Sequence, residues 1–482
     1  MRILIKDIDV IKSADSEVMR GADIGIEDGR ILFVNCSDNM CAAGDAAGAM
    51  RGQGNQDAAV TDAKQQRGQG SPGAGAVTAN QQREQGSPGV QNGFVPDKVI
   101  NGCRKLAIPG LVNAHCHSAM TLLRGFADDL ELETWLFDNI IPAESKLAPD
   151  DVYWGTQLGI IEMIKNGTTC FNDMYLNMDE VGRAVYESGI RASISIGPLL
   201  SGKRGDALVD VEGCRAFFNK WDKKDGGRIR TNIEIHSMYM YTPETLRAGA
   251  ELAKELNSPI HIHMLETATE RKNILEQFGK SSIELALEFG LLDVGVIAAH
   301  CVHVSEADIS IMVNKGVNAV HNPTSNLKLA SGIAPVKEMI AAGVNVCLGT
   351  DGVASNNVLN MFKEMHLAAL IHKGVRGDPT LILAGEAFRM ATENGAKAIG
   401  FSDSGVIGPG RAADIVIIDM DKPHLTPLHN HMSTLVYSVG GHDVDTVIVD
   451  GDILMESREM LTIDEEKVKN MVRRISESRF RS

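Results

Sequence analysis

Two histidines end an apolar run early in the chain, Pro109-Gly-Leu-Val-Asn-Ala-His115-Cys-His117. If this run is a β-strand, side chains two positions apart lie on the same side of it, so His115 and His117 project together. Neutral imidazole is a favoured ligand of Zn²⁺ and of several other divalent ions. A buried strand with two hydrogen-bonded histidines explains an isolated His-x-His equally well. The rest of the chain must therefore decide between the two interpretations.

Further polar residues end later apolar runs of the chain, namely His236, His263 with Glu266, His300 with His303, and Asp351. In barrels of alternating strands and helices, the reaction site is built at the carboxyl ends of the strands. Histidines that only fill a core would be scattered along the strands, so this clustering favours one functional site. Asp351 would be costly in an apolar setting without a partner, and a cation is a natural partner. A metal-bound Asp351 could also accept a proton from a coordinated water.

The roles of the neighbouring residues follow less directly from spacing. His261 shares a strand face with His263 but lies farther from the strand end, so we expect it in the layer below the site. We place His303 outside the site. Glu266 is either a second ligand or a general acid, and an acid would need the raised pKa that a dry barrel mouth supplies. The remaining histidines are interpreted as surface or packing residues, and they include His321, His366, His372, His424, His429 and His431.

Composition narrows the class of protein. The formal net charge of -16 argues against nucleic acid and acidic membranes as partners, because both need a basic face. The N-terminus is interrupted by charge too early for a signal peptide, and no apolar run approaches a membrane span, so we expect a cytoplasmic protein. The 8 cysteines are scattered without a Cys-x-x-Cys pair, which indicates reduced core residues and not a disulfide framework.

The order of elements predicts an α/β fold. Two β-patterned segments around the Asp28-Gly29 turn signal begin the chain, and two more around Asp450-Gly451 end it. Residues 36–98 are rich in Gly, Gln, Ala and Ser, and we expect a disordered surface insertion. Between the chain ends, apolar runs alternate with amphipathic stretches, which favours a (β/α)8 TIM barrel. We expect eight strands at 106–117, 168–175, 192–199, 229–238, 260–267, 295–303, 318–324 and 344–351.

These elements group into two expected domains. Residues 106–404 would form the barrel, and residues 1–105 together with 405–482 would form a small composite β-sandwich domain built from both chain ends. At 482 residues the chain is long enough for one barrel of ordinary size with an attached smaller domain.

The polar residues form a set that resembles a known family. The matching segments are Pro109-Gly-Leu-Val-Asn-Ala-His-x-His, His263-x-x-Glu266, Ala299-His300-Cys-Val-His, His321-Asn-Pro-x-Ser-Asn-Leu-Lys-Leu and Leu348-Gly-Thr-Asp-Gly. Together they resemble the amidohydrolase superfamily, in particular the branch that deaminates 5'-methylthioadenosine, S-adenosylhomocysteine and 5'-deoxyadenosine. The resemblance covers nearly the whole chain outside the insertion.

The resemblance implies a role for each residue of the set. One divalent ion, expected to be Zn²⁺, would be held by His115, His117, His263 and Asp351. A metal-bound hydroxide would attack C6 of the adenine ring, Glu266 would protonate N1, and His300 would orient the hydroxide. The residues that match substrate contacts of the family are Glu144 for the ribose hydroxyls, His236, Ser355 and, as a wall of the pocket, Trp135.

Alternatives remain open at this point. Residues around Lys203-Arg204-Gly205 do not match the arginines that bind the amino-acid carboxylate of S-adenosylhomocysteine, which favours a small 5' group. His236 stands where two-metal relatives have a carboxylated lysine, which favours one metal. Deamination of guanine, cytosine or a triazine and a non-catalytic nucleoside-binding barrel are the rival functions. The absence of a Pro-Cys-x-x-Cys element excludes a cytidine-deaminase type of zinc site. By analogy with relatives, we expect a homo-oligomer, either a dimer or a tetramer.

Overall fold

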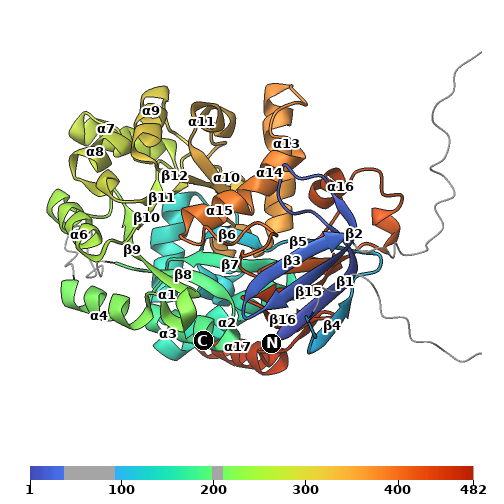
Figure 1. Ribbon diagram of the computed structural model, residues 1–482. Coiled ribbons are helices and arrows are strands. Elements are labelled where there is room, and N and C mark those ends of the chain that lie inside the picture. Colours follow the sequence, from blue (N-terminus) through green and yellow to red (C-terminus); the bar gives the residue numbers. More distant parts are fainter. Residues whose placement is uncertain (37–92, 198–209, 481–482) are drawn as a thin grey trace, which may run out of the picture.

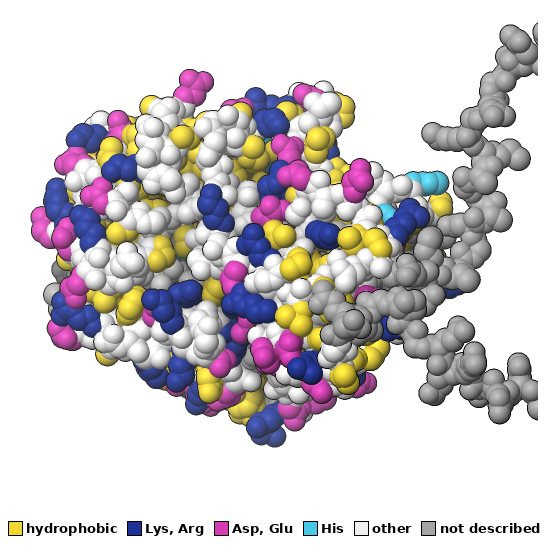
Figure 2. Space-filling model, in the orientation of Figure 1, with side chains coloured by type: hydrophobic (Ala, Val, Ile, Leu, Met, Phe, Trp, Pro, Cys, Tyr) yellow, Lys and Arg dark blue, Asp and Glu magenta, His cyan; other side chains and the backbone are white. Residues whose placement is uncertain are grey.

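The computed structural model describes residues 1–36, 93–197 and 210–480 (Figure 1). Most of the expected insertion at 36–98 and all of Lys203-Arg204-Gly205 therefore lie outside the described residues. Basic and acidic side chains are interspersed over the face of the molecule drawn in Figure 2. No helix in the described part of the chain is long and apolar enough to cross a membrane.

Eight parallel strands form the barrel, and each pairs with the next along the chain. Asp351, just after the last strand, donates its backbone N–H to His115 O of the first at 3.0 Å, which brings the two edges together. The predicted barrel is thus confirmed. The strands are β6 (Leu111–Cys116), β7 (Thr168–Asp173), β8 (Arg191–Ile196), β9 (Ile229–Ser237), β10 (Ile260–Met264), β11 (Val296–His300), β12 (Asn318–His321) and β13 (Asn345–Leu348).

Helices cover the outside of the barrel (Figure 1). Several begin at residues with a strong capping preference: Thr242 accepts a hydrogen bond from Thr245 N, and Ser281 and Ser305 each form a capping box. The main helices are α2 (Pro149–Lys165), α3 (Met178–Ser188), α4 (Val211–Trp221), α6 (Pro243–Leu256), α7 (Ala268–Phe278), α8 (Ser282–Glu288), α9 (Glu306–Lys315), α11 (Val336–Ala342), α13 (Met361–Arg376), α14 (Ala384–Met390) and α15 (Glu393–Ala398).

Both chain ends join in one nine-stranded sheet, in the order β17-β16-β15-β14-β5-β1-β2-β3, with β4 also paired to β1. Residues from both ends, such as Ile5 and Ile417, share one buried apolar cluster, as expected for a composite β-domain. The strands are β1 (Arg2–Val10), β2 (Met19–Glu27), β3 (Arg30–Cys36), β4 (Lys98–Asn101), β5 (Lys105–Pro109), β14 (Ile415–Asp419), β15 (Val444–Val449), β16 (Asp452–Glu456) and β17 (Glu459–Met460). Asp28-Gly29 and Asp450-Gly451 form the two predicted turns.

One predicted strand is in fact two. The run at 106–117 divides at Gly110 into β5, which pairs with β14 in the nine-stranded sheet, and β6, which is the first barrel strand. A Cβ atom at Gly110 would lie 1.9 Å from Thr169 Oγ1, so the crossing leaves no room for a side chain. The apolar run carries no polar break at this point, and the change of sheet is fixed by tertiary contacts.

The barrel and the nine-stranded sheet are joined by a buried ion pair. Arg191, at the start of β8, donates to both carboxylate oxygens of Asp414, at 2.8 and 3.1 Å, and to Asp450 at 2.9 Å. The Arg191 and Asp414 side chains are only 5% and 0% exposed. The C-terminal helix α17 (Glu465–Phe480) adds a second connection, since Arg479 on it donates to Asp151 at the start of α2 at 2.7 Å.

The cysteines agree with the expectation in part. Five of them are free and buried, Cys116, Cys170, Cys214, Cys301 and Cys347, and Cys36 is free and exposed. Cys103 is disulfide-bonded, so the prediction of a fully reduced chain is wrong at this position.

Candidate active site

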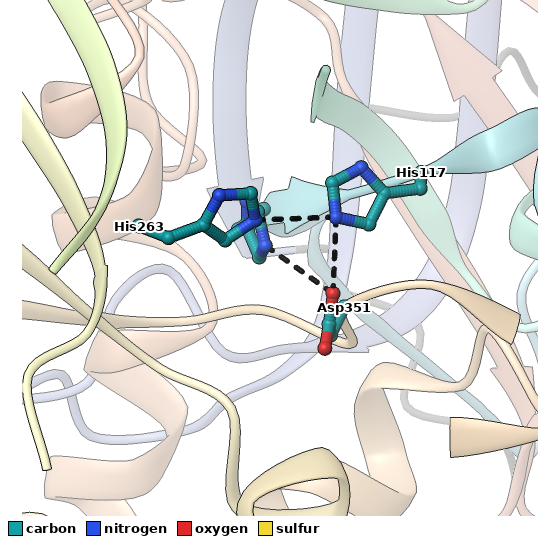
Figure 3. Close-up of side chains that lie close together, drawn as sticks. His117, His263 and Asp351 are labelled. Atoms are coloured by element: carbon teal, nitrogen blue, oxygen red, sulfur yellow. Dashed lines mark hydrogen bonds and ion pairs between the residues drawn. The ribbon is translucent and has the colours of Figure 1, made fainter. Parts of the chain in front are cut away.

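Three imidazoles and one carboxylate converge at the carboxyl ends of the barrel strands. His115 lies on β6, His117 directly follows it, His263 lies on β10, and Asp351 follows β13. One ligand atom from each of the four residues lies within 4.8 Å of the others. The Nε2 atoms of His115 and His117 lie 3.3 and 3.2 Å from Asp351 Oδ1 (Figure 3). The sequence predicted all four as one cluster, and the structure brings them together.

The remaining ring nitrogens are held by other groups, which leaves Nε2 of each imidazole free to ligate. His117 Nδ1 bonds to Met174 O, and His263 Nδ1 bonds to His236 O at 2.7 Å. His115 Nδ1 lies 2.8 Å from His261 Nε2. If His115 donates through Nδ1, His261 must donate in turn through its own Nδ1, and Ser195 Oγ lies 3.0 Å from that atom.

The cluster fits a divalent cation on three grounds. His115 Nε2 is buried and has no hydrogen-bond partner among the described residues. Burial lowers the pKa of His115 to about 4 and that of His263 well below its usual value, so both rings are neutral and can ligate. Burial alone would raise the pKa of Asp351, but the neighbouring imidazoles of His115 and His117 hold it well below its usual range. Burial lowers the pKa of His117, but hydrogen bonding and charge attraction from Asp351 raise it to about 9, so a bound cation would displace a proton from this ring. Three imidazoles and one ionised carboxylate are a typical donor set for Zn²⁺.

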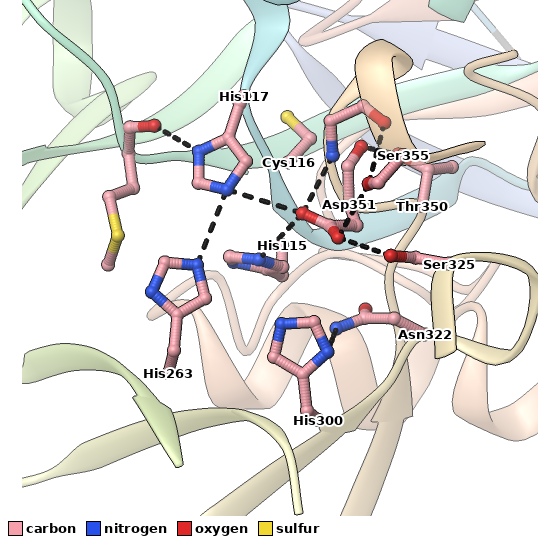
Figure 4. A network of polar contacts seen from close by, with 12 residues as sticks. His115, Cys116, His117, His263, His300, Asn322, Ser325, Thr350, Asp351 and Ser355 are labelled. Carbon is pink, nitrogen blue, oxygen red and sulfur yellow. Dashed lines mark hydrogen bonds and ion pairs between the residues drawn. The ribbon is translucent and has the colours of Figure 1, made fainter. Parts of the chain in front are cut away.

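Asp351 is oriented by its own set of donors (Figure 4). Its Oδ2 accepts from Ser325 Oγ at 2.5 Å and from Ser355 Oγ at 2.8 Å, and its Oδ1 accepts from Gly352 N at 2.7 Å. Ser355 was expected in the substrate pocket, but it is not among the residues that line the cavity, and its hydroxyl points to Asp351 instead. Ser355 therefore supports the cluster.

A cavity of about 280 Å³ opens directly above the cluster. Glu266 and His300 line it at this end, with Glu266 Oε2 3.7 Å from His300 Nε2. Burial raises the pKa of Glu266, which favours the protonated form that a proton donor needs. His300 Nδ1 lies 2.8 Å from Asn326 Oδ1, so this nitrogen donates and Nε2 is left as an acceptor facing the cavity.

The cavity is also lined by Trp135, Glu144, Tyr175 and His236. Burial raises the pKa of Glu144 to about 7, and Tyr175 partly offsets the rise. Glu144 Oε1 is buried and has no hydrogen-bond partner among the residues described. An acceptor left in this state is suited to a ligand hydroxyl. The predicted contacts Trp135, Glu144 and His236 thus all line the same cavity.

Sequence reasoning missed several residues of the site. Glu234 lines the cavity two residues before His236, and burial raises its pKa to about 8. Glu270 accepts hydrogen bonds from the backbone N–H groups of Leu265 and Glu266, both at 2.9 Å. An alternating β pattern could have placed Glu234 on the face of His236. No pattern marks Glu270, which reads as an ordinary acidic residue in the first turn of a helix.

The two doubtful histidines lie outside the metal cluster, as expected. His303 bonds to Ser331 O at 2.7 Å. His261 is fully buried below the cluster, where it contacts His115 and Asn172. His261 nevertheless touches a predicted ligand directly, so it is more than a layer residue.

Comparison with known proteins agrees with this fold. A model of the amidohydrolase family matches residues 106–454, and the chain belongs to this family. Among curated proteins, the chain is 49% identical over 478 residues to a 5-methylthioadenosine/S-adenosylhomocysteine deaminase of Acetivibrio thermocellus, covering 99% of each chain. It is 51% identical over 372 residues to the protein of the same name from Dictyoglomus thermophilum, covering 77% of this chain and 87% of the relative.

Solved structures give the same picture. A zinc-bound adenosine deaminase from Xanthomonas campestris superimposes with a TM-score of 0.83 at 30% identity, over 100% of this chain and 99% of the other. A guanine deaminase from C. acetobutylicum with bound guanine superimposes with a TM-score of 0.75 at 20% identity, over 94% of this chain and 100% of the other, and it is similar in fold.

Proposed function

We propose that this protein deaminates the adenine ring of 5'-modified adenosines by hydrolysis, releasing ammonia and leaving the inosine analogue. The expected substrates are 5'-deoxyadenosine and 5'-methylthioadenosine, with S-adenosylhomocysteine and adenosine as further candidates. The observation that carries the proposal is the coincidence, in one cavity, of the four-residue cluster, a buried acid at Glu266 and a buried Glu144 whose Oε1 has no hydrogen bond of good geometry among the described residues. The full-length similarity to named deaminases supports it.

His115, His117, His263 and Asp351 would hold one divalent ion, which we propose is Zn²⁺. The ion supplies a water whose pKa is lowered enough for it to act as a nucleophile near neutral pH. Asp351 would accept the proton of that water, because its carboxylate is ionised and held in place by Ser325 and Ser355. His300 would orient the water through Nε2, the nitrogen that its bond to Asn326 leaves unprotonated.

Glu266 would give its proton to N1 of the ring, which makes C6 more electrophilic toward the water. After the water adds to C6, the proton taken up by Asp351 would pass to the amino group, which leaves as ammonia. The proton of the added hydroxyl would return to Glu266, which forms the C6 carbonyl. The Glu144 carboxylate would accept hydrogen bonds from the two ribose hydroxyls, and this diol contact favours a nucleoside over a free base such as guanine. His236 and Trp135 would contact the substrate from the walls of the cavity. We also propose that the protein acts in salvage of S-adenosylmethionine by-products, in the cytoplasm, as a dimer or tetramer.

Steady-state deamination of 5'-deoxyadenosine, 5'-methylthioadenosine, S-adenosylhomocysteine and adenosine, followed by the loss of adenine absorbance, tests the proposal. Guanine and a triazine serve as comparison substrates. We expect turnover of at least one of the four nucleosides and little turnover of guanine or the triazine. Turnover of the free base or the triazine alone would replace the proposed substrate class.

A further inference from the structure

A second group of metal-ligating side chains lies on the nine-stranded sheet, away from the residues of the barrel site. It consists of His424, in the short helix η4 (Pro423–Leu425), and of His442 and Asp443, in η5 (Gly441–Asp443) just before β15. One ligand atom of each residue lies within 4.8 Å of the others. Apart from the barrel cluster, it is the other such group among the described residues.

The three side chains place their possible ligand atoms close to one another. His424 Nε2 lies 3.0 Å from Asp443 Oδ2, and His442 Nε2 lies 3.5 Å from Asp443 Oδ1. The two rings are 5.4 Å apart at 45°. Both imidazoles therefore reach the same carboxylate from different sides and leave an open side toward solvent.

The Asp443 carboxylate is buried, and only one of its oxygens accepts hydrogen bonds of good geometry from the described residues. The Asp443 side chain is 0% exposed, whereas those of His424 and His442 are 43% and 72% exposed. Oδ2 accepts from Gly440 N at 2.9 Å as well as from His424. Oδ1 is buried and has no hydrogen bond of good geometry among the described residues. A buried carboxylate oxygen with no partner is costly, and a cation between it and the two rings would satisfy it.

We propose that His424, His442 and Asp443 form a second metal site, specific for a borderline divalent ion such as Zn²⁺, with water as the fourth ligand. Two neutral imidazoles and one carboxylate oxygen suit Zn²⁺ and the neighbouring transition ions, and they do not suit Ca²⁺ or Mg²⁺, which prefer oxygen ligands. The site ties the segment after β14 to the turn that enters β15. Binding there would stabilise this edge of the composite β-domain, since an ion that binds only the folded state raises its stability.

The test counts metal ions on the full-length protein. The wild-type protein, His424→Ala, His442→Ala and the matched control His429→Ala are equilibrated with micromolar Zn²⁺, dialysed and measured by elemental analysis. His429 is an exposed histidine of the same segment that lies outside the group. We expect two ions per subunit in the wild type and in His429→Ala, and one in His424→Ala and His442→Ala.

Cobalt gives a second readout that does not depend on stoichiometry alone. With Co²⁺ in place of Zn²⁺, the difference spectrum between wild type and His442→Ala should show the visible bands of a four-coordinate ion. Both altered histidines are exposed, so the variants should fold and keep their deaminase activity. Equal metal content in the wild type and in a variant with His424 and His442 both replaced would overturn the proposal and leave His-Asp ion pairs only.

Discussion

Glu270 controls where the proposed proton donor lies. Its carboxylate is only 6% exposed, and it binds two consecutive backbone N–H groups, those of Leu265 and Glu266, at 2.9 Å each. Leu265 has a left-handed φ of 48°, a conformation that leucine rarely adopts. The two hydrogen bonds stabilise this backbone turn, and the turn directs the Glu266 side chain into the cavity.

Glu270→Gln should weaken these hydrogen bonds, because it replaces a carboxylate by an amide of nearly the same size and shape. The amide oxygen of the new side chain can still accept a hydrogen bond from the Leu265 N–H. The amide NH₂ group then faces the Glu266 N–H, so two hydrogen-bond donors oppose each other. A buried N–H that loses its acceptor costs about 1–3 kcal/mol. If most of this free energy is lost from the transition state because Glu266 is misplaced, kcat should fall by about 10- to 100-fold, since 1.4 kcal/mol corresponds to a factor of ten.

The assay is steady-state kinetics on the best nucleoside substrate, with elemental analysis to show that the metal content is unchanged. KM should change little, because Glu270 does not touch the proposed ribose contact. Ser282→Ala is the matched control: Ser282 Oγ donates to Glu270 Oε1 at 3.1 Å but does not bind the backbone at Glu266. Equal losses of kcat in both variants, or a lower melting temperature with an unchanged kcat, would refute the positioning role.

Three further predictions concern buried ionisable side chains. Glu266→Gln should keep its metal by elemental analysis and lose about 10²- to 10⁴-fold in kcat, and surviving turnover would mean that the proton donor lies elsewhere. Arg191→Met should lower the free energy of unfolding by about 3–5 kcal/mol in urea titrations, because it leaves buried Asp414 unpaired. Burial raises the pKa of Glu364 to about 7, above its unfolded value, so this group costs stability progressively as pH rises from about 4.5 to 7. In Glu364→Gln, melting temperatures should therefore fall less between pH 5 and pH 8 than in the wild type, and parallel pH profiles would contradict the assignment.

The metal cluster was predictable because each ligand ends an apolar run, and the parity of a β-strand fixes which neighbours share its face. That rule places His115 and His117 on one face of the strand, and the resemblance to the amidohydrolase superfamily added their role as ligands. The supporting residues were not predictable in the same way. His261 lies on the strand of His263 but contacts His115 of β6, and this contact depends on how the barrel closes. Ser355 is close to Asp351 in sequence, and only the turn of the backbone shows that it contacts the carboxylate and not the substrate.

The fold was predictable to the same extent and for the same reason. Alternation of apolar runs and amphipathic stretches defines the eight barrel strands, and the Asp-Gly pairs define the turns of the composite sheet. The sequence did not predict the change of sheet at Gly110, because an uninterrupted apolar run is compatible with a strand in either sheet. What distinguishes them is the close approach of Thr169, which belongs to a distant part of the sequence.

Several site residues at the mouth of the barrel have strained backbone conformations, which only the contacts of the folded barrel can hold in place. Leu265, His300 and Asp351 all have left-handed φ values, of 48°, 75° and 61°. Leu265 directly follows β10, His300 ends β11, and Asp351 lies in the turn after β13. Such residues cost on the order of 1–3 kcal/mol each and persist only where neighbouring contacts fix them. Here the fixing contacts are hydrogen bonds between strand ends, such as Asp351 N to His115 O at 3.0 Å. The side chains are therefore pre-oriented toward the cavity before any substrate or ion binds. The free energy of the strained backbone is offset by the contacts that form when the barrel folds.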